Sequence, residues 1–345
     1  MPLYQFKRSS TANLIFYFLL IILVVFILFN FTKLKETLVL FREIKPIWFA
    51  LAVVLQILSY IFVANIFHYL FILSREEPAI SRKELFKLSF VALFVTQIIP
   101  LGGFSGQGYL VHHFQKRKIP AHISFSTVIL ESFTYYLAHL VFSLFTFVYL
   151  IVIFKGVVSG ILLLVALFGI ILFVFLDYMI LMLTRKKTMI SLSGKIEKHK
   201  WLNWLFNKVK LQFPEKEILT KEWEGVWRIN RSLLQPLFWQ LMIIVADAGT
   251  VFLLFNGFNV KINFLVALMG MTLTKIISMV SVSPGALVFF EGAMILFYTA
   301  FGIPLHFVIV VTLLFRGLSF WLPMPFGLYF YKHLGRVNNN FNANA

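Results

Sequence analysis

Five charged side chains stand inside long apolar stretches of the sequence: Glu131, Asp247, Lys275, Glu291 and Arg316. A charge at the centre of an apolar helix costs about 2.5–3.5 kcal/mol on insertion scales. Each of these residues therefore needs a partner or a function that offsets this cost. Arg316 has the most specific chemistry, because a planar guanidinium can bind two oxygens of one phosphate group at once.

Two tracts of helix-breaking residues accompany these charges. Their characteristic residues are Pro100, Gly102, Gly103, Ser283, Pro284 and Gly285. Proline removes a backbone donor and disrupts the helical hydrogen bonds around it, so each tract breaks its apolar stretch near the middle. The freed backbone groups need polar partners, which a polar substrate or a water-filled cavity can provide. We therefore expect both tracts to line one polar cavity together with Gln107 and Glu291.

The elements that position these residues must be membrane helices. Of the 345 residues, 60% are hydrophobic and only 13% are charged, and the mean hydropathy is +0.88. An ordinary soluble domain has about 25% charged residues. This composition excludes a soluble enzyme, a disordered protein and a secreted disulfide scaffold, and long apolar runs argue against an outer-membrane barrel. A polytopic helical membrane protein remains.

Charge and histidine patterns exclude further classes of function. The net charge of +17 fits basic cytoplasmic loops, and no nucleic-acid-binding motif accompanies it. The histidines His68, His139 and His306 do not have the spacing of a metal site, and Ser193-Gly194-Lys195 is not a phosphate-binding loop. We therefore expect no metal, no cofactor and no ATP hydrolysis by this chain.

Six apolar stretches are long enough to cross a membrane, namely 13–31, 47–73, 121–154, 157–183, 232–256 and 305–331. Two more, 85–115 and 264–301, contain the breaks and are expected to be re-entrant helical hairpins. The basic loop 184–231 should be cytoplasmic, as should both termini. Within it, 198–210 has the pattern of an amphipathic helix that lies in the inner interface.

An internal repeat relates the two broken stretches. Pro100 and Pro284 are offset by 184 residues, as are Gln107 and Glu291. The same offset relates span 232–256 to 48–72. With the orientation from loop charges, the two units are inverted, which predicts an all-α integral membrane protein with an inverted-topology repeat. The predicted parts are an N-terminal helix and outer loop (1–45), repeat one (46–154), a linking span and basic loop (155–231), repeat two (232–331) and a disordered tail (332–345).

Several segments resemble one known family. These are Val282-Ser283-Pro284-Gly285-Ala286 leading to Glu291, Phe301-Gly302-Ile303-Pro304, Leu314-Phe315-Arg316-Gly317 and, upstream, Ile99-Pro100-Leu101-Gly102-Gly103 with Glu131. They are similar to the signature of the lysylphosphatidylglycerol synthase transmembrane family, the lipid-flippase half of the multiple peptide resistance factor and its stand-alone relatives. Gln107 stands where an acidic residue is expected. The resemblance covers roughly 46–331 and implies lipid translocation by a stand-alone member without an aminoacyl-transferase domain.

Two interpretations remain open for the charged residues. Arg316 and Glu131 are nearly equivalent in the repeat, so they can form a structural ion pair between the units. Alternatively, Arg316 binds a lipid phosphate and Glu131 orients it. Lys275 can pair with Glu291 in the same hairpin, for structure or for headgroup binding, and Asp247 has no assigned role.

We therefore expect a lipid translocase of the inner (cytoplasmic) membrane, not an enzyme, which moves an anionic, aminoacylated or polyprenyl-phosphate lipid between leaflets. Its partners would be membrane lipids with anionic headgroups, and a lipid-modifying enzyme is a second candidate partner. Two alternatives are a non-catalytic membrane subunit of a lipid synthase and a membrane transferase that acts on a lipid-linked substrate. A transferase needs acidic residues in outer loops, where only Glu36 and Glu43 occur.

Overall fold

The computed structural model describes residues 43–73, 80–98, 104–153, 157–198, 231–281 and 286–343. These residues form helices and no strand, and the helices lie in one compact unit from Pro46 onward. Their bounds are α3 Pro46–Leu73, α4 Arg82–Ile98, α5 Phe104–Lys116, α6 Ala121–Ile153, α7 Val157–Thr184, α8 Lys186–Lys198, η1 Arg231–Leu233, α12 Leu234–Gly257, α13 Phe264–Met279, α14 Phe289–Ala300, α15 Leu305–Arg316, η3 Gly317–Trp321 and α16 Pro323–Ala343.

Five of the described helical segments are long and apolar enough to cross a membrane. They are Pro46–Leu73, Ala121–Val152, Gly160–Thr184, Leu234–Gly257 and Leu305–Leu334. The prediction of an all-α membrane protein is confirmed. The first predicted span, 13–31, and the predicted amphipathic helix at 198–210 lie outside the described residues, apart from position 198 at the end of α8.

The helix ends repeat along the chain with the offset seen in the sequence. Leu73 ends α3 and Gly257 ends α12, 184 residues later. The same offset separates the ends of α5 and α14 at Lys116 and Ala300, and the starts of α6 and α15 at Ala121 and Leu305. Helices α3, α4 and α5 thus correspond in order and nearly in length to α12, α13 and α14, and the match extends to the starts of α6 and α15.

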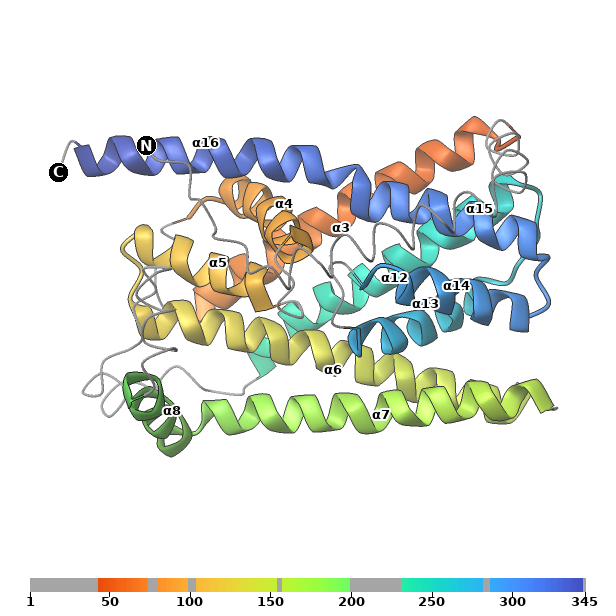
Figure 1. The fold of residues 1–345 in the computed structure, drawn as a ribbon, viewed down its shortest axis with the longest axis horizontal. Helices are drawn as coiled ribbons and strands as arrows, with labels where there is room; N and C mark the ends of the chain where they lie inside the picture. The colour runs from red at the N-terminus through yellow and green to blue at the C-terminus, as the bar shows by residue number, and fades with distance from the viewer. Residues whose placement is uncertain are drawn as a thin grey trace, which may run out of the picture. The chain divides into compact units, whose positions relative to one another are not determined.

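The two halves run in opposite directions within the unit (Figure 1). The equivalent helices α3 and α12 pack along each other and are antiparallel. Helices α4 and α5 meet near the middle and return to one end, whereas α13 and α14 meet near the middle and return to the other. These four helices have 12 to 17 residues, or about 18–26 Å at 1.5 Å per residue, which is less than the ~30 Å hydrocarbon core.

A glycine lies at the contact between the two helices of each short pair, α4–α5 and α13–α14. A Cβ atom on Gly106 of α5 would lie 2.5 Å from the carbonyl oxygen of Ala92 in α4. A Cβ atom on Gly270 of α13 would lie 2.5 Å from the ring of Tyr298 in α14. The hydroxyl of Tyr298 also donates a 2.7 Å hydrogen bond to the carbonyl of Ala267. The absence of a side chain at each glycine therefore lets the two helices of each pair approach closely.

A charged cluster sits at the start of α4. One oxygen of Glu84 accepts hydrogen bonds from Nε and Nη2 of Arg117 at 2.8 and 2.6 Å, and Nε2 of His113 lies 2.9 Å from it. Partial burial by itself would raise the pKa of Glu84, but the hydrogen bonds and charges of His113 and Arg117 outweigh it, so the pKa is lowered. This cluster ties the free ends of α4 and α5 together.

The last predicted span, 305–331, is not one regular helix. After Arg316 the chain makes a π-helical turn, in which the Leu322 N–H donates to the Gly317 carbonyl at 2.8 Å. Pro323, which has no N–H, then begins α16. Helix α16 continues to Ala343, and the disordered tail predicted at 332–345 stays a prediction. Leu334 is buried in the core beside α4, which holds the helix beyond the predicted span.

Candidate functional site

Arg316 is a buried cation at the end of α15, directly before the π-helical turn. Its guanidinium carbon lies 4.7 Å from the ring centre of Phe290 and 4.5 Å from that of Phe320. Its Nε donates a 2.6 Å hydrogen bond to Oε1 of Glu291. Two aromatic faces and a carboxylate thus stabilise a charge that would be expensive in an apolar span. Single π-turns in helices are often found at functional sites.

Glu291 links Arg316 to a strained stretch of backbone. Its second oxygen, Oε2, accepts a 2.7 Å hydrogen bond from the N–H of Val288 at the start of α14. Val288 has φ 74° and Ala286 has φ 53°, in the left-handed region that side chains avoid. Such conformations cost of order 1–3 kcal/mol each and persist where surrounding contacts enforce them. The Glu291 carboxylate is one of these contacts.

Lys275 pairs with Asp247, so the predicted pair of Lys275 with Glu291 is wrong. Its Nζ lies 3.4 Å from Oδ2 of Asp247. Gln56 Nε2 donates to Oδ1 of the same carboxylate at 3.2 Å and to Oγ1 of Thr250 at 3.0 Å. Helix α13 places Lys275 toward α12, while the start of α14 places Glu291 toward α15. Asp247, unassigned from the sequence, is therefore the centre of a polar cluster.

Glu131 does not pair with Arg316 either. Its two oxygens accept hydrogen bonds from Nε2 of Gln240 at 3.2 Å and, at the 3.5 Å limit, from Nε2 of Gln107. Gln107 makes a shorter bond, of 2.7 Å, to the hydroxyl of Ser132. Glu131 is bonded to α5 and α12, and within the described part of the chain no cation forms an ion pair with it. Gln107 and Glu131 are thus brought together, whereas Glu291 is bonded to Arg316 and Val288.

The two ion pairs share one aromatic ring. Lys275 Nζ lies 5.8 Å from the ring centre of Phe290, the same ring on which Arg316 stacks. Beside Lys275 a small cavity of about 10 Å³ is lined by His139, Ile244, Asp247, Met271, Thr272 and Lys275. That volume is close to what one water molecule needs. Nδ1 of His139 lies 2.9 Å from the carbonyl of Tyr135, which can only accept, so Nδ1 is the donor of this hydrogen bond.

Comparison with known proteins identifies the family. Residues 14–327 match the sequence model of the lysylphosphatidylglycerol synthase TM region. The chain belongs to this family. One relative is the UPF0104 membrane protein MJ1595 of Methanocaldococcus jannaschii, which is 24% identical over 335 residues that cover 94% of each chain. The family resemblance inferred from the short motifs is confirmed, and it indicates a lipid-related function in a membrane.

In this family member, six of the predicted site residues cannot be placed. Pro100, Gly102, Gly103, Ser283, Pro284 and Gly285 lie outside the described residues. The shared cavity predicted for the two tracts therefore stays a prediction. Among the residues that the structure describes, no three His, Asp or Glu side chains gather in a way that could hold a metal ion.

Five members of these clusters did not stand out in the sequence. Gln56, Gln240 and Thr250 are polar residues within apolar spans, and this is a signal that could have found them. Phe290 and Phe320 carried no such signal, because the chain contains 42 phenylalanines. Only their shared contact with the guanidinium of Arg316 distinguishes these two rings.

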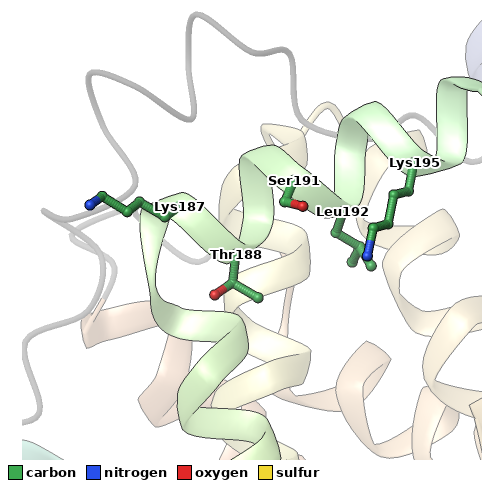
Figure 2. A pocket seen from close by; sticks show the side chains of 5 residues that line it. All are labelled: Lys187, Thr188, Ser191, Leu192 and Lys195. Carbon is green, nitrogen blue, oxygen red and sulfur yellow. The ribbon is translucent and has the colours of Figure 1, made fainter.

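A second, open cavity of about 320 Å³ lies along α8, between the end of α7 and residue 198. Figure 2 shows its lining side chains on successive turns of α8, with Lys187 and Lys195 at opposite ends of the row. Met189, on another face of α8, is buried against Phe125 and Ile129 of α6. Helix α8 is thus amphipathic, with basic residues on its open side, as in helices that lie at a membrane surface.

Proposed function

We propose that this family member is a lipid translocase whose headgroup site is centred on Arg316. The observation that carries the proposal is a guanidinium buried inside an apolar span, stacked between Phe290 and Phe320 and bonded to Glu291. Cations within membrane spans are costly and usually mark substrate pathways. A phosphate group is the ligand that best matches the guanidinium fork.

The ion pair offers a way for a headgroup to enter. Glu291 is the more accessible partner, with 24% of its side chain exposed against 9% for Arg316. A phosphate presents oxygens with the same acceptor chemistry as a carboxylate, so it can take the place of Glu291 beside the guanidinium. Release of Glu291 also frees its bond to Val288 N–H, which relaxes the strained start of α14. Headgroup binding and a change in this hairpin are then linked.

The proposed topology explains how the site reaches both leaflets. We take the halves α3–α6 and α12–α16 as inverted repeats, with α4–α5 and α13–α14 as re-entrant hairpins from opposite faces, in a cell membrane with both termini in the cytoplasm. Support comes from the matching helix ends, the opposite directions of equivalent helices and the short length of the hairpin helices. Inverted repeats with broken helices are typical of transporters that expose one site alternately to each side.

Reconstitution of the purified chain tests this function. Vesicles containing the protein and acyl-chain-labelled NBD lipids are treated with external dithionite, which bleaches only the outer leaflet. We expect labelled phosphatidylglycerol to become fully bleachable, and labelled phosphatidylcholine to remain about half protected, as in protein-free vesicles. If neither lipid nor a polyprenyl phosphate crosses faster than in protein-free vesicles, the protein is not a translocase, and a scaffolding subunit becomes the better account.

A further inference from the structure

The polar cluster around Asp247 lies where helices of the two halves meet, and the ring of Phe290 connects it to Arg316. Gln56 comes from α3 and His139 from α6, in the first half, while Asp247 and Lys275 come from α12 and α13 in the second. A carboxylate, an ammonium and an imidazole thus border one cavity of the size of a water molecule. The proposed headgroup site does not use these groups.

Charge balance connects this cluster with the headgroup site. Arg316 and Lys275 contribute two positive charges on Phe290, and Glu291 and Asp247 contribute two negative charges, so the site is neutral before it binds a ligand. An anionic headgroup would leave one uncompensated negative charge inside the membrane, which is strongly unfavourable. One added proton restores neutrality. An ionised Glu131 would make the net charge of the occupied site more negative, so that proton uptake would be more favourable still.

We propose that Asp247 binds the proton that couples lipid movement to a proton gradient, with one proton taken up for each anionic headgroup. This inference rests on the proposed translocase function and adds its energy source. The proton binds Oδ2 of Asp247, which neutralises the carboxylate and breaks the ion pair between Asp247 and Lys275. Lys275 keeps its charge and turns toward Phe290, beside Arg316, where it strengthens the attraction for the headgroup. Loss of the proton reverses both changes.

Asp247 is suited to this role by the groups around it. Gln56 holds Oδ1, so Oδ2 is the oxygen whose partner changes. Its titratable neighbours are Tyr60 on α3, Tyr135 and His139 on α6, and Lys275 on α13. Because Nδ1 of His139 is its donor to Tyr135, Nε2 of the neutral ring carries a lone pair, which can receive a proton and pass it on through one water.

Coupling of this kind is reciprocal. If a proton on Asp247 favours headgroup binding, a bound headgroup must favour the proton by the same factor. Proton and anionic lipid then cross together, with no net charge moved. A pH difference of one unit should drive the lipid from the acidic toward the alkaline side, up to a tenfold ratio between the leaflets.

The transport experiment imposes one pH unit across proteoliposomes that contain labelled phosphatidylglycerol. Wild type should shift the leaflet ratio toward the alkaline side. Asp247→Asn should still move lipid, because its site is permanently one charge more positive, but its leaflet ratio should stay near one. Asp177→Asn, which changes a buried aspartate of α7 outside the cluster, is the matched control and should behave like wild type.

A binding experiment does not depend on the fold of any variant. Short-chain phosphatidylglycerol is added to wild-type protein in weakly buffered detergent with a pH indicator, and about one proton should be taken up per lipid bound. Binding without proton uptake overturns the inference. So does lipid movement in wild type that ignores the pH difference, and the translocase function then still stands. If wild-type protein moves no lipid at all, the proposed function fails first and this inference with it.

Discussion

The pairing of Arg316 with Glu291 can be measured by a double-mutant cycle of Glu291→Gln, Arg316→Gln and both together. Removing one partner of a buried ion pair costs about 3–5 kcal/mol, because the other charge is left uncompensated. Glu291 is one-quarter exposed, so each single substitution should lie near the lower end, at about 3 kcal/mol. The double variant leaves neither charge behind and should cost little more than one single variant. The coupling energy should therefore be about 2–3 kcal/mol.

The assay is the free energy of reversible unfolding in mixed detergent micelles. A second cycle, Glu131→Gln with Arg316→Gln, is the matched control, because it tests the pair favoured by the repeat symmetry. Glu131 is bonded to Gln240 and Gln107 instead, so this coupling should stay within about 0.5 kcal/mol. Equal coupling in both cycles, or none in the first, would refute the assignment of Glu291 as the partner of Arg316.

Two further predictions concern the hairpins. The chain has no cysteine, so single cysteines can map its topology: Lys83→Cys and Lys116→Cys should react with an impermeant reagent from one side of the membrane, and Lys261→Cys and Leu305→Cys only from the other. Reaction of Lys83→Cys and Lys116→Cys from opposite sides would show that α4–α5 crosses. Because the pKa of Glu84 is lowered in the folded protein, its stabilising effect is full above the unfolded value of 4.5 and is lost as pH falls through the folded pKa. Unfolding measured between pH 7 and 3 should thus show a smaller acid loss of stability in Glu84→Gln than in wild type, and identical losses would contradict this.

The helices themselves were predictable from the sequence, because apolar length and helix breakers act locally. The spans at 47–73, 121–154, 157–183 and 232–256 match described helices to within about three residues. The offset of 184 residues reappears in the helix ends. The π-helical turn after Arg316 was not predictable, because an apolar stretch has the same composition and length whether or not one of its turns is π-helical. The burial of Leu334, just beyond the predicted span, was likewise visible only in the packing.

The partners of the charged residues could not be predicted, for a different reason. A charge inside a span must have a partner, but its identity depends on which helix faces are opposed. For Arg316 the sequence offered only Glu131, by repeat symmetry, whereas its carboxylate partner in the structure is Glu291. Lys275 lies in the same predicted hairpin as Glu291, yet Lys275 pairs with Asp247 of α12 and Glu291 pairs with Arg316 of α15. Only tertiary packing decides between such pairs.

The most direct test of the account is the rate of phosphatidylglycerol movement by Arg316→Ala in proteoliposomes. It is measured beside wild type and Arg316→Lys at matched density of folded protein, below the unfolding temperature of every variant. The account predicts that Arg316→Ala falls to the rate of protein-free vesicles, and that Arg316→Lys recovers only part of the rate because the two-pronged contact with phosphate is lost. Wild-type rates in Arg316→Ala would contradict it and leave Arg316 with a structural role alone.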